Sequence, residues 1–263
     1  ILGINAHHAD SSACLIVDGK LIVAIEEERI NRKKHFSGFP VESIKACIKQ
    51  AGVNENEITD IAFNTRPQSN LVAKSLFFFK NSFLNKKNLI NRFKKKINLK
   101  NFLLKKYNLK KNIKIHLVEH HLSHIASAFF PSGYDDAVGL SIDGSGDFVS
   151  LAISICKNNK IEINKKIYFP DSLGIFYHAM TQFLGFKNYG DEYKVMGMAS
   201  YGEPKYFNKI KKNLFIDDYN ILPKLNLKYF NHHHPNFKYI ADKDLKIDNI
   251  FNEKLEFLFA HDK

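Results

Sequence analysis

Ile1-Leu2-Gly3-Ile4-Asn5 opens the chain, and two further apolar runs follow it, Ala13-Cys14-Leu15-Ile16-Val17 and Leu21-Ile22-Val23-Ala24-Ile25. Each run has the length and composition of a β-strand. The pair Asp18-Gly19 separates the second run from the third, and an Asp-Gly pair between apolar runs is a strong signal for a β-hairpin. The sequence therefore predicts three consecutive strands, with the polar loop from His7 to Ser12 at one end of their sheet.

A second group of three strands is predicted over Ala137 to Asp143, Val149 to Ile155 and Ile161 to Tyr168. The first of these is interpreted as a buried strand, whose C-terminal edge would carry the Asp143 carboxylate. The turn that follows is Asp143-Gly144-Ser145-Gly146-Asp147, in which the two glycines would free backbone amides to approach a phosphate. In both groups a strand ends in a polar turn and returns through a hairpin, a pattern that resembles actin-like ATPases and sugar kinases.

Helices are predicted from Val41 to Ala51, Gly174 to Leu184 and Glu192 to Ala199, and one more strand from Ile58 to Asn64. The C-terminal part of the chain carries little pattern. We interpret His232-His233-His234 as a loop feature rather than as a set of ligands.

A histidine cluster lies in the stretch Val118-Glu119-His120-His121-Leu122-Ser123-His124. His120 and His124 are four residues apart, so on a helix their imidazoles project from one face about a turn apart. This geometry suits a single divalent ion, and Asp143 would add an oxygen ligand. Alone, such a histidine pair is more often solvated or buried in a core, and an Asp-Gly turn is often only a turn. Together they predict a site where metal and phosphate chemistry meet.

The composition is that of a globular protein: the 263 residues are 44% hydrophobic and 25% charged, enough for one large core or two modest ones. No apolar run approaches the roughly 18 residues of a membrane helix, and no signal-type segment is present, so we expect a cytoplasmic protein without a membrane partner. Cys14, Cys47 and Cys156 show no pattern of a disulfide framework or zinc site, and we expect buried thiols.

The formal net charge of +12 has a local source. Residues 71–115 hold thirteen lysines and one arginine and no acidic residue. Apolar residues from Phe79 to Leu104 recur at roughly helical spacing, so we expect amphipathic helices with lysine-rich outer faces, inserted into the fold. A solvated face explains this charge better than a polyanion does, and we do not expect a nucleic-acid partner. A non-catalytic basic module that binds nucleic acid remains an alternative.

Five blocks of the chain, in this order, resemble the O-carbamoyltransferases of the NodU and TobZ type. The resemblance implies an α/β fold of the actin-like ATPase or sugar kinase type (ribonuclease H-like), with mixed sheets, flanking helices and an incomplete second half. Residues 1–263 would be the N-terminal part of a TsaD-like domain with a basic helical insertion at 71–115, and a C-terminal YrdC-like domain is absent from this chain. The blocks are Gly3-Ile4-Asn5 with His8, Asp10, Ser11 and Ser12; Glu26 to His35; His120 to His124; Asp143 to Asp147; and Asp191 to Gly202.

The activity implied by the resemblance is ATP- and metal-dependent O-carbamoyl transfer. Family enzymes make a carbamoyl adenylate from carbamoyl phosphate and ATP and pass the carbamoyl group to a hydroxyl, which we expect on a sugar or another natural product. We expect the 263 residues alone to be inactive. The alternative is a TsaD-like tRNA threonylcarbamoyltransferase, but the block from Glu26 to His35 favours the first activity. The sequence leaves the acceptor open, and iron, zinc and manganese all suit the ligands.

Site roles follow from the resemblance position by position. His8 is expected to handle a proton of the acceptor hydroxyl or of carbamate, because an imidazole titrates near neutrality. Lys34 would supply a cation for a phosphate or carbamoyl oxygen. A backbone-bonded loop histidine and a surface lysine are the alternative interpretations, and Ala9 intervenes where family members place the loop histidine directly before its aspartate. The remaining roles are metal ligands for His120, His124 and Asp143, phosphate contacts for Gly144, Ser145, Gly146 and Asp147, and nucleotide contacts for Lys194 and Gly197.

Overall fold

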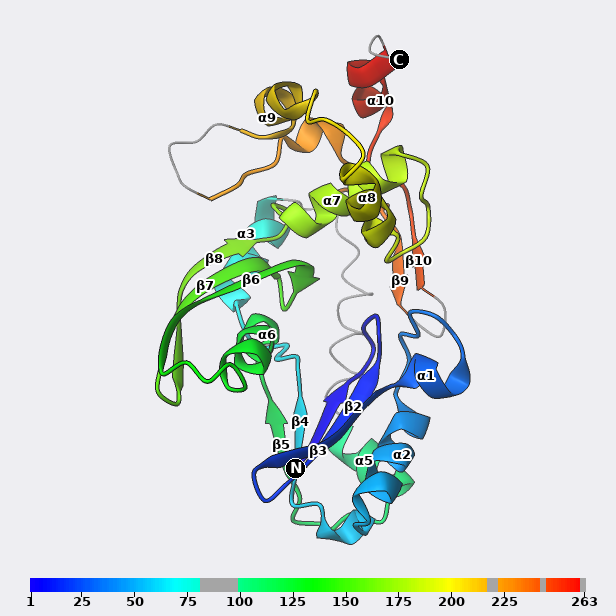
Figure 1. The fold of residues 1–263 in the computed structure, drawn as a ribbon, viewed down its shortest axis with the longest axis vertical. Coiled ribbons are helices and arrows are strands. Elements are labelled where there is room, and N and C mark those ends of the chain that lie inside the picture. The colour runs from blue at the N-terminus through cyan, green and yellow to red at the C-terminus, as the bar shows by residue number, and fades with distance from the viewer. Residues whose placement is uncertain (81–98, 217–221, 242–244, 261–263) are drawn as a thin grey trace. The chain divides into compact units, whose positions relative to one another are not determined.

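The computed structural model describes residues 1–80, 99–216, 222–241 and 245–260 (Figure 1). The chain divides into two compact units. The first comprises Ile1–Ser69, Asn81–His120 and Ile240–Lys246, and the second comprises Asn70–Lys80, His121–Tyr239 and Ile247–Lys263.

The first unit is built on a five-stranded mixed sheet with the order β3-β2-β1-β4-β5. Strands β1 (Leu2–Asn5), β2 (Ser12–Val17) and β3 (Lys20–Glu26) form an antiparallel meander. Strands β4 (Asp60–Phe63) and β5 (Lys114–Leu117) extend the sheet beyond β1, each parallel to its neighbour. This order and these directions are those of the ribonuclease H-like fold of actin-like ATPases, so the predicted fold class is confirmed.

The hairpin between β2 and β3 forms where it was predicted. Asp18 and Gly19 have φ angles of 48° and 78°, the left-handed values that a type I′ turn needs at both central positions. The alternation within β1 buries Leu2 and Ile4, which join Leu15 of β2 in the core of the first unit.

Helix α2 (Val41–Ala51) covers this core and has the predicted bounds. Its Ile44 and Cys47 side chains are fully buried. The helix begins at the buried carboxylate of Glu27, which opens the short helix α1 (Glu27–Asn31) and accepts hydrogen bonds from the backbone amides of Glu42 and Ser43 at 3.1 and 2.7 Å. A carboxylate at a helix N-terminus satisfies amides that have no partner inside the helix.

The described part of the basic segment contains a helix on either side of residues 81–98, and its last residues form a loop and the start of β5. Helix α3 (Leu71–Lys80) belongs to the second unit, and helix α5 (Leu99–Lys106) buries Leu103 in the core of the first. The predicted apolar face was wrong at Phe79, which is 84% exposed, because α3 makes its ring contacts through Phe77 instead. Predicted members of that face within residues 81–98 lie outside the described residues.

The second unit repeats the first meander. Strands β6 (Asp136–Gly146), β7 (Val149–Lys157) and β8 (Lys160–Tyr168) pair in antiparallel order β6-β7-β8. Helix α6 (His120–Phe129) packs Ile125 and Phe129 against one face of this sheet.

The prediction that the strand before Asp143 is buried was wrong. Val138, Leu140 and Ile142 of β6 are 74%, 59% and 50% exposed. They alternate with Gly139 and Ser141, which lie on the opposite face of the strand. This face packs against α6, since a Cβ on Gly139 would meet Ile125 of that helix. Strand β6 is thus an edge strand of its sheet. One of its faces is buried and the other is exposed, although the run of residues is continuously apolar.

The glycine-rich turn also differs from its prediction. Strand β6 continues through Gly146, with a shift of register between Ile142 and Gly146, and the hairpin tip is Asp147-Phe148. The left-handed φ angles belong to these two residues, at 49° and 76°. Phe148 tolerates that conformation because its ring contacts Phe77 and Phe169, with centroid distances of 5.5 and 5.7 Å.

The region with little sequence pattern folds around an aromatic core. Phe230 and Leu255 are fully buried there, together with Ala179 of α7.

Cys47 and Cys156 are buried as expected, whereas Cys14 is partly exposed, and burial raises the pKa of the Cys47 thiol to about 11. Within the described residues, no helix has both the length and the apolar character needed to cross a membrane. The elements that follow β8 are first α7 (Leu173–Phe183) and α8 (Glu192–Ala199), where helices were predicted, and then α9 (Phe207–Leu214), β9 (Tyr239–Ala241), β10 (Leu245–Ile247) and α10 (Glu253–Phe259).

The histidine triplet lies in a loop, as predicted, but its first member is part of the core. His232 is 6% exposed, donates from Nε2 to the carbonyl of Pro170 at 2.8 Å, and contacts the rings of Phe169 and Phe230. Burial lowers the pKa of His232 to about 4.

This buried imidazole should make the fold sensitive to acid. Below pH 6.5 the unfolded chain protonates this histidine while the folded chain does not, so stability should fall as the pH drops from about 6.5 toward 4, by at most roughly 3 kcal/mol. His232→Gln keeps a donor for Pro170 and cannot titrate. Denaturant unfolding of wild type and this variant between pH 7 and 4.5 measures the difference, with the exposed His234→Gln as the control. Equal pH dependence in all three proteins would contradict the assignment.

Candidate metal centre

His120 begins helix α6 directly beyond β5, close to the carboxyl ends of the parallel strands. Its Nδ1 lies 3.3 Å from the carbonyl oxygen of Asn64, which follows β4. A carbonyl can only accept, so Nδ1 carries the proton and Nε2 presents a lone pair. Histidines that bind metals are typically oriented in this way, through a hydrogen bond from the other ring nitrogen to a carbonyl or carboxylate.

Asn64 connects His120 to the first loop. Its Nδ2 donates to Oδ1 of Asn5 at 3.2 Å, and Nδ2 of Asn5 donates to the carbonyls of Ala9 and Asp10 at 3.2 and 2.9 Å. Asn5 and Asn64 end or follow neighbouring parallel strands, β1 and β4. Hydrogen bonds of side-chain amides therefore connect the two strands and the first loop at the edge of the sheet where α/β proteins bind ligands.

His124 lies one turn further along α6, on the same face as His120. Its Nε2 is 3.7 Å from Oδ2 of Asp143. One ligand atom from each of His120, His124 and Asp143 can be chosen so that all three lie within 4.8 Å of one another. Atoms that share one ion at about 2 Å each lie at most about 4 Å apart, so small movements of these side chains would bring the three atoms onto one ion. The donor set fits a divalent metal, and the three predicted ligands come together.

Helix α7 fixes the position of Asp143. The Ser172 hydroxyl caps this helix by accepting from the Ile175 amide, and it lies 3.0 and 2.8 Å from the carbonyls of Asp143 and Gly144. A Cβ on Gly174 would come within 2.6 Å of backbone atoms of Asp143 and Gly144. Neither Ser172 nor Gly174 was predicted to support the site, although a serine before an apolar helical run is a recognisable N-cap signal.

His8 lies in the first loop, beside the candidate ligand. Its ring centroid is 5.2 Å from that of His120, and its Nδ1 is 3.4 Å from the carbonyl of Ala9. The carbonyl of His8 accepts from the Ser11 hydroxyl at 3.1 Å. This arrangement combines both interpretations of His8, since it is a loop histidine close to a backbone carbonyl that also borders the site.

Lys34 is exposed and follows α1, next to His35. Lys194 of α8 is not free: its Nζ lies 2.7 Å from Oδ1 of Asp191, which raises the pKa of the lysine and lowers that of the aspartate. Gly197 lies on the same helix, with nothing near the position a Cβ would take.

Helix α8 is tied to α7 at its first residue. His178 of α7 is buried and its Nδ1 lies 2.5 Å from Oε1 of Glu192, while the Tyr177 hydroxyl donates to the Glu192 carbonyl at 3.1 Å. Burial is the largest single influence and acts to raise the pKa of Glu192, but the hydrogen bonds from His178 and from the Glu192 backbone, together with the charge of His178, leave the pKa lowered.

His121, although central in the histidine cluster, is a structural residue. It is fully buried, with Nδ1 2.8 Å from the Ser141 hydroxyl and Nε2 2.8 Å from the Val149 carbonyl. Both ring nitrogens are engaged, so neither is offered to a metal.

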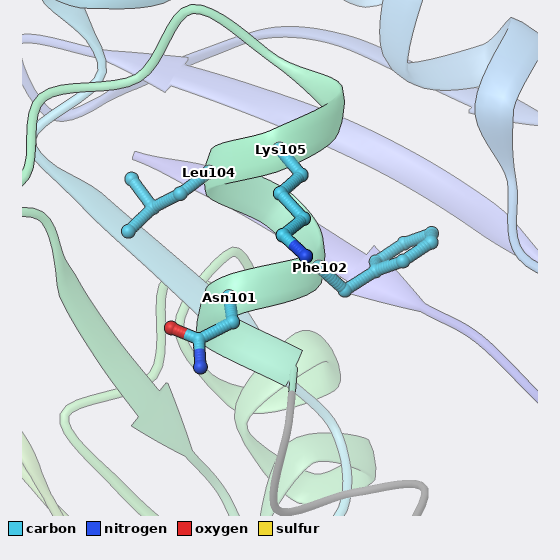
Figure 2. Close-up of a pocket in the computed structure, with 4 residues that line it drawn as sticks. All are labelled: Asn101, Phe102, Leu104 and Lys105. Atoms are coloured by element: carbon cyan, nitrogen blue, oxygen red, sulfur yellow. The ribbon is translucent and has the colours of Figure 1, made fainter.

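A hollow of about 480 Å³ lies along α5, as Figure 2 shows, and is bordered by Asn101, Phe102, Leu104 and Lys105. None of these residues belongs to the predicted site. The candidate metal ligands lie instead at the start of α6 and at Asp143.

The strand order and the His/His/Asp cluster define an actin-like fold with a candidate metal centre. The family described as Carbamoyltransferase N-terminus matches residues 1–257, and the chain belongs to that family.

Relatives agree with this assignment. The uncharacterized protein sll1178 of Synechocystis is 37% identical over 88% of this chain and 39% of its own length. Nodulation protein NolNO of Sinorhizobium fredii is 36% identical over 76% of this chain and 29% of its own length. YeaZ from Pseudomonas aeruginosa aligns with a TM-score of 0.34 and 12% identity over 65% of this chain and 67% of that one, too distantly to support an argument. The chain spans about two fifths of the Synechocystis relative and less than a third of the Sinorhizobium relative.

Removing a candidate ligand should abolish metal binding without unfolding the chain. His124 is half exposed on α6, so His124→Ala leaves no large cavity and takes one of three ligands away. Metal content after purification, together with Mn²⁺ and Zn²⁺ titrations, tests this. The matched control is His116→Asn on β5, where a half-exposed histidine pairs with Asp60. Equal metal binding in wild type and His124→Ala would rule the site out.

Gly174→Ala should weaken metal binding although it touches no ligand side chain. Its Cβ would press on the backbone of Asp143 and Gly144, and residues that orient ligands typically contribute about ten- to a hundredfold in metal affinity. Titration with the same metals measures the change, and circular dichroism checks the helix, since alanine itself favours helix over glycine. Gly202→Ala is the control, because its Cβ would meet its nearest atom only at 4.0 Å. Unchanged metal affinity in Gly174→Ala would show that α7 does not determine the position of Asp143.

Proposed function

We propose that this chain provides the metal- and nucleotide-binding part of an ATP-dependent O-carbamoyltransferase, which makes carbamoyl adenylate from carbamoyl phosphate and ATP and transfers the carbamoyl group to a hydroxyl. The observation that carries the proposal is the convergence of His120, His124 and Asp143 at the start of α6, in a chain that belongs to a carbamoyltransferase family over residues 1–257. The donor set suits iron, zinc or manganese.

The metal ligands leave room for a substrate. Three protein ligands keep further coordination positions open, and an ion bound there would polarise a phosphate oxygen. Asn64 holds the His120 ring, and Ser172 holds the backbone that carries Asp143, so both ligands are oriented before substrate arrives.

Residues beyond Asp143 are proposed to bind the nucleotide. Gly144, Ser145, Gly146 and Asp147 would lie along the phosphates and present backbone amides to them. Lys194 and Gly197 of α8 would lie beside the nucleotide. The Asp191 carboxylate fixes the direction of the Lys194 side chain. The ammonium group of Lys194 would then bind both this carboxylate and a phosphate.

His8 is proposed to accept the acceptor's proton. As the hydroxyl oxygen forms its bond to the carbamoyl carbon, the bond from that carbon to the phosphate oxygen of the adenylate breaks and AMP leaves. The hydroxyl proton passes to the imidazole of His8. Lys34 would offset negative charge on a phosphate or carbamoyl oxygen.

The acceptor is proposed to be a hydroxyl of a sugar or another natural product, and a YrdC-like domain is proposed as the part that handles carbamoyl phosphate. Because the chain matches well under half of each relative's length, both statements concern the whole protein rather than these 263 residues.

Substitution of His8 should separate chemistry from binding. In the full-length protein, supplied with ATP, carbamoyl phosphate and candidate sugars, His8→Asn should lower kcat for carbamoyl transfer by about a hundredfold or more, since general-base catalysis typically contributes that much. AMP release and the mass of the acceptor are the readouts. His7→Asn is the matched control, because asparagine tolerates the left-handed φ of 60° at that position. Full activity in His8→Asn would remove it from the mechanism, and turnover independent of carbamoyl phosphate would refute the proposed function.

A further inference from the structure

Two loops of the first unit carry the candidate groups His8 and Lys34. The first loop, residues 6–11, joins β1 to β2, and the second, residues 32–40, joins α1 to α2. The backbone amide of Ser11 donates to the carbonyl of Phe36 at 2.9 Å, and that of His7 donates to the carbonyl of Gly38 at 3.1 Å. The Ser11 hydroxyl also lies 2.7 Å from the Gly38 carbonyl. The loops therefore form one hydrogen-bonded layer.

Both loops contain backbone conformations that side chains rarely adopt. In the first loop, His7 and Asp10 flank His8 and Ala9 with φ angles of 60° and 59°. In the second, Arg32 and His35 flank Lys34 and its neighbour with φ angles of 59° and 52°. Such conformations persist when surrounding contacts enforce them, and they cluster at functional sites. The directions of the His8 and Lys34 side chains depend on these four residues.

A pair of side chains joins the two strained positions. Nδ1 of His35 lies 2.8 Å from Oδ1 of Asp10, and a carboxylate accepts, so Nδ1 carries the proton. The backbone amide of His35 donates to Oε2 of Glu28 at 2.8 Å. His35 is thus held at its ring by the first loop and at its backbone by α1.

We propose that Asp10 and His35 are a positioning pair, which locks the two loops together and so fixes the directions in which His8 and Lys34 present their side chains to substrate. The proposal rests on the proposed function for the identity of those two groups. The side chains of Asp10 and His35 are 43% and 34% exposed, and exposed pairs of this kind contribute little to stability. Its contribution is to geometry, and catalysis is sensitive to displacements of about 1 Å.

The test uses two substitutions at Asp10 in the full-length protein. Asp10→Gly accepts the left-handed backbone without strain but removes the carboxylate, whereas Asp10→Asn tolerates that backbone and keeps an acceptor oxygen. The matched control is Asp18→Gly, because Asp18 also has a left-handed φ, of 48°, and lies in the exposed hairpin of the same sheet.

Asp10→Gly should lower kcat about ten- to a hundredfold with little change in the KM for ATP, while Asp10→Asn restores most of the rate and Asp18→Gly matches wild type. The thermal unfolding midpoint should be similar in all four proteins. In the absence of substrate, the imidazole NMR signals of His8 should move in Asp10→Gly and not in Asp18→Gly.

Unchanged kcat and unchanged His8 signals in Asp10→Gly would overturn the proposal. A loss of activity that only parallels a loss of thermal stability would overturn it as well, as would Mn²⁺ binding that requires Asp10, Glu28 and His35, whose ligand atoms lie within 4.8 Å of one another. If wild type shows no turnover that depends on carbamoyl phosphate, the proposed function fails, and the His8 signals still decide whether the pair positions the loop.

Discussion

The hydrogen bond between the side chains of Asn64 and Asn5 is the contact on which the positions of the first loop and of His120 depend. It lies where the parallel strands β1 and β4 end. The side-chain amide of Asn5 also donates to the carbonyls of Ala9 and Asp10, and the backbone carbonyl of Asn64 orients His120. An amide has two donors and one acceptor oxygen, so one side chain can fix a loop and a neighbouring strand together. The parallel pairing of β1 and β4 brings Asn5 and Asn64 close together, and their hydrogen bonds then fix the orientation of both side chains and of the first loop.

Features with a local cause were predictable from the sequence. The Asp18-Gly19 hairpin follows from two residues that accept left-handed backbone, and the bounds of α2 follow from Pro40 before it and Gly52 after it. The spacing of His120 and His124 places both rings on one helical face whatever surrounds the helix. The same spacing could not reveal that His121, between them, is bonded at both nitrogens to Ser141 and Val149.

Features that depend on distant parts of the chain were not predictable in this way. The apolar run of β6 has the same composition whether one or both faces are covered, so its open face at Val138 and Leu140 had no sequence signal. The role of Gly174 arises only because the start of α7 approaches the backbone of Asp143, thirty-one positions earlier in the chain. Ser172 offered a partial signal, since its type and position before an apolar helix indicate a cap, though not what the cap would touch.

Helix α7 makes the two halves of the proposed nucleotide site mechanically dependent. Its first turn holds the Asp143-Gly144 backbone through Ser172, and its middle holds the first residue of α8 through Tyr177 and His178. A ligand that moved the Asp143-Gly144 backbone would therefore also act on α7, which contacts α8. A ligand that moved α8 would act on the Asp143-Gly144 backbone through the same helix. Coupling free energies are reciprocal, so if α7 couples the two parts, a ligand on either part would change the affinity of the other by the same factor.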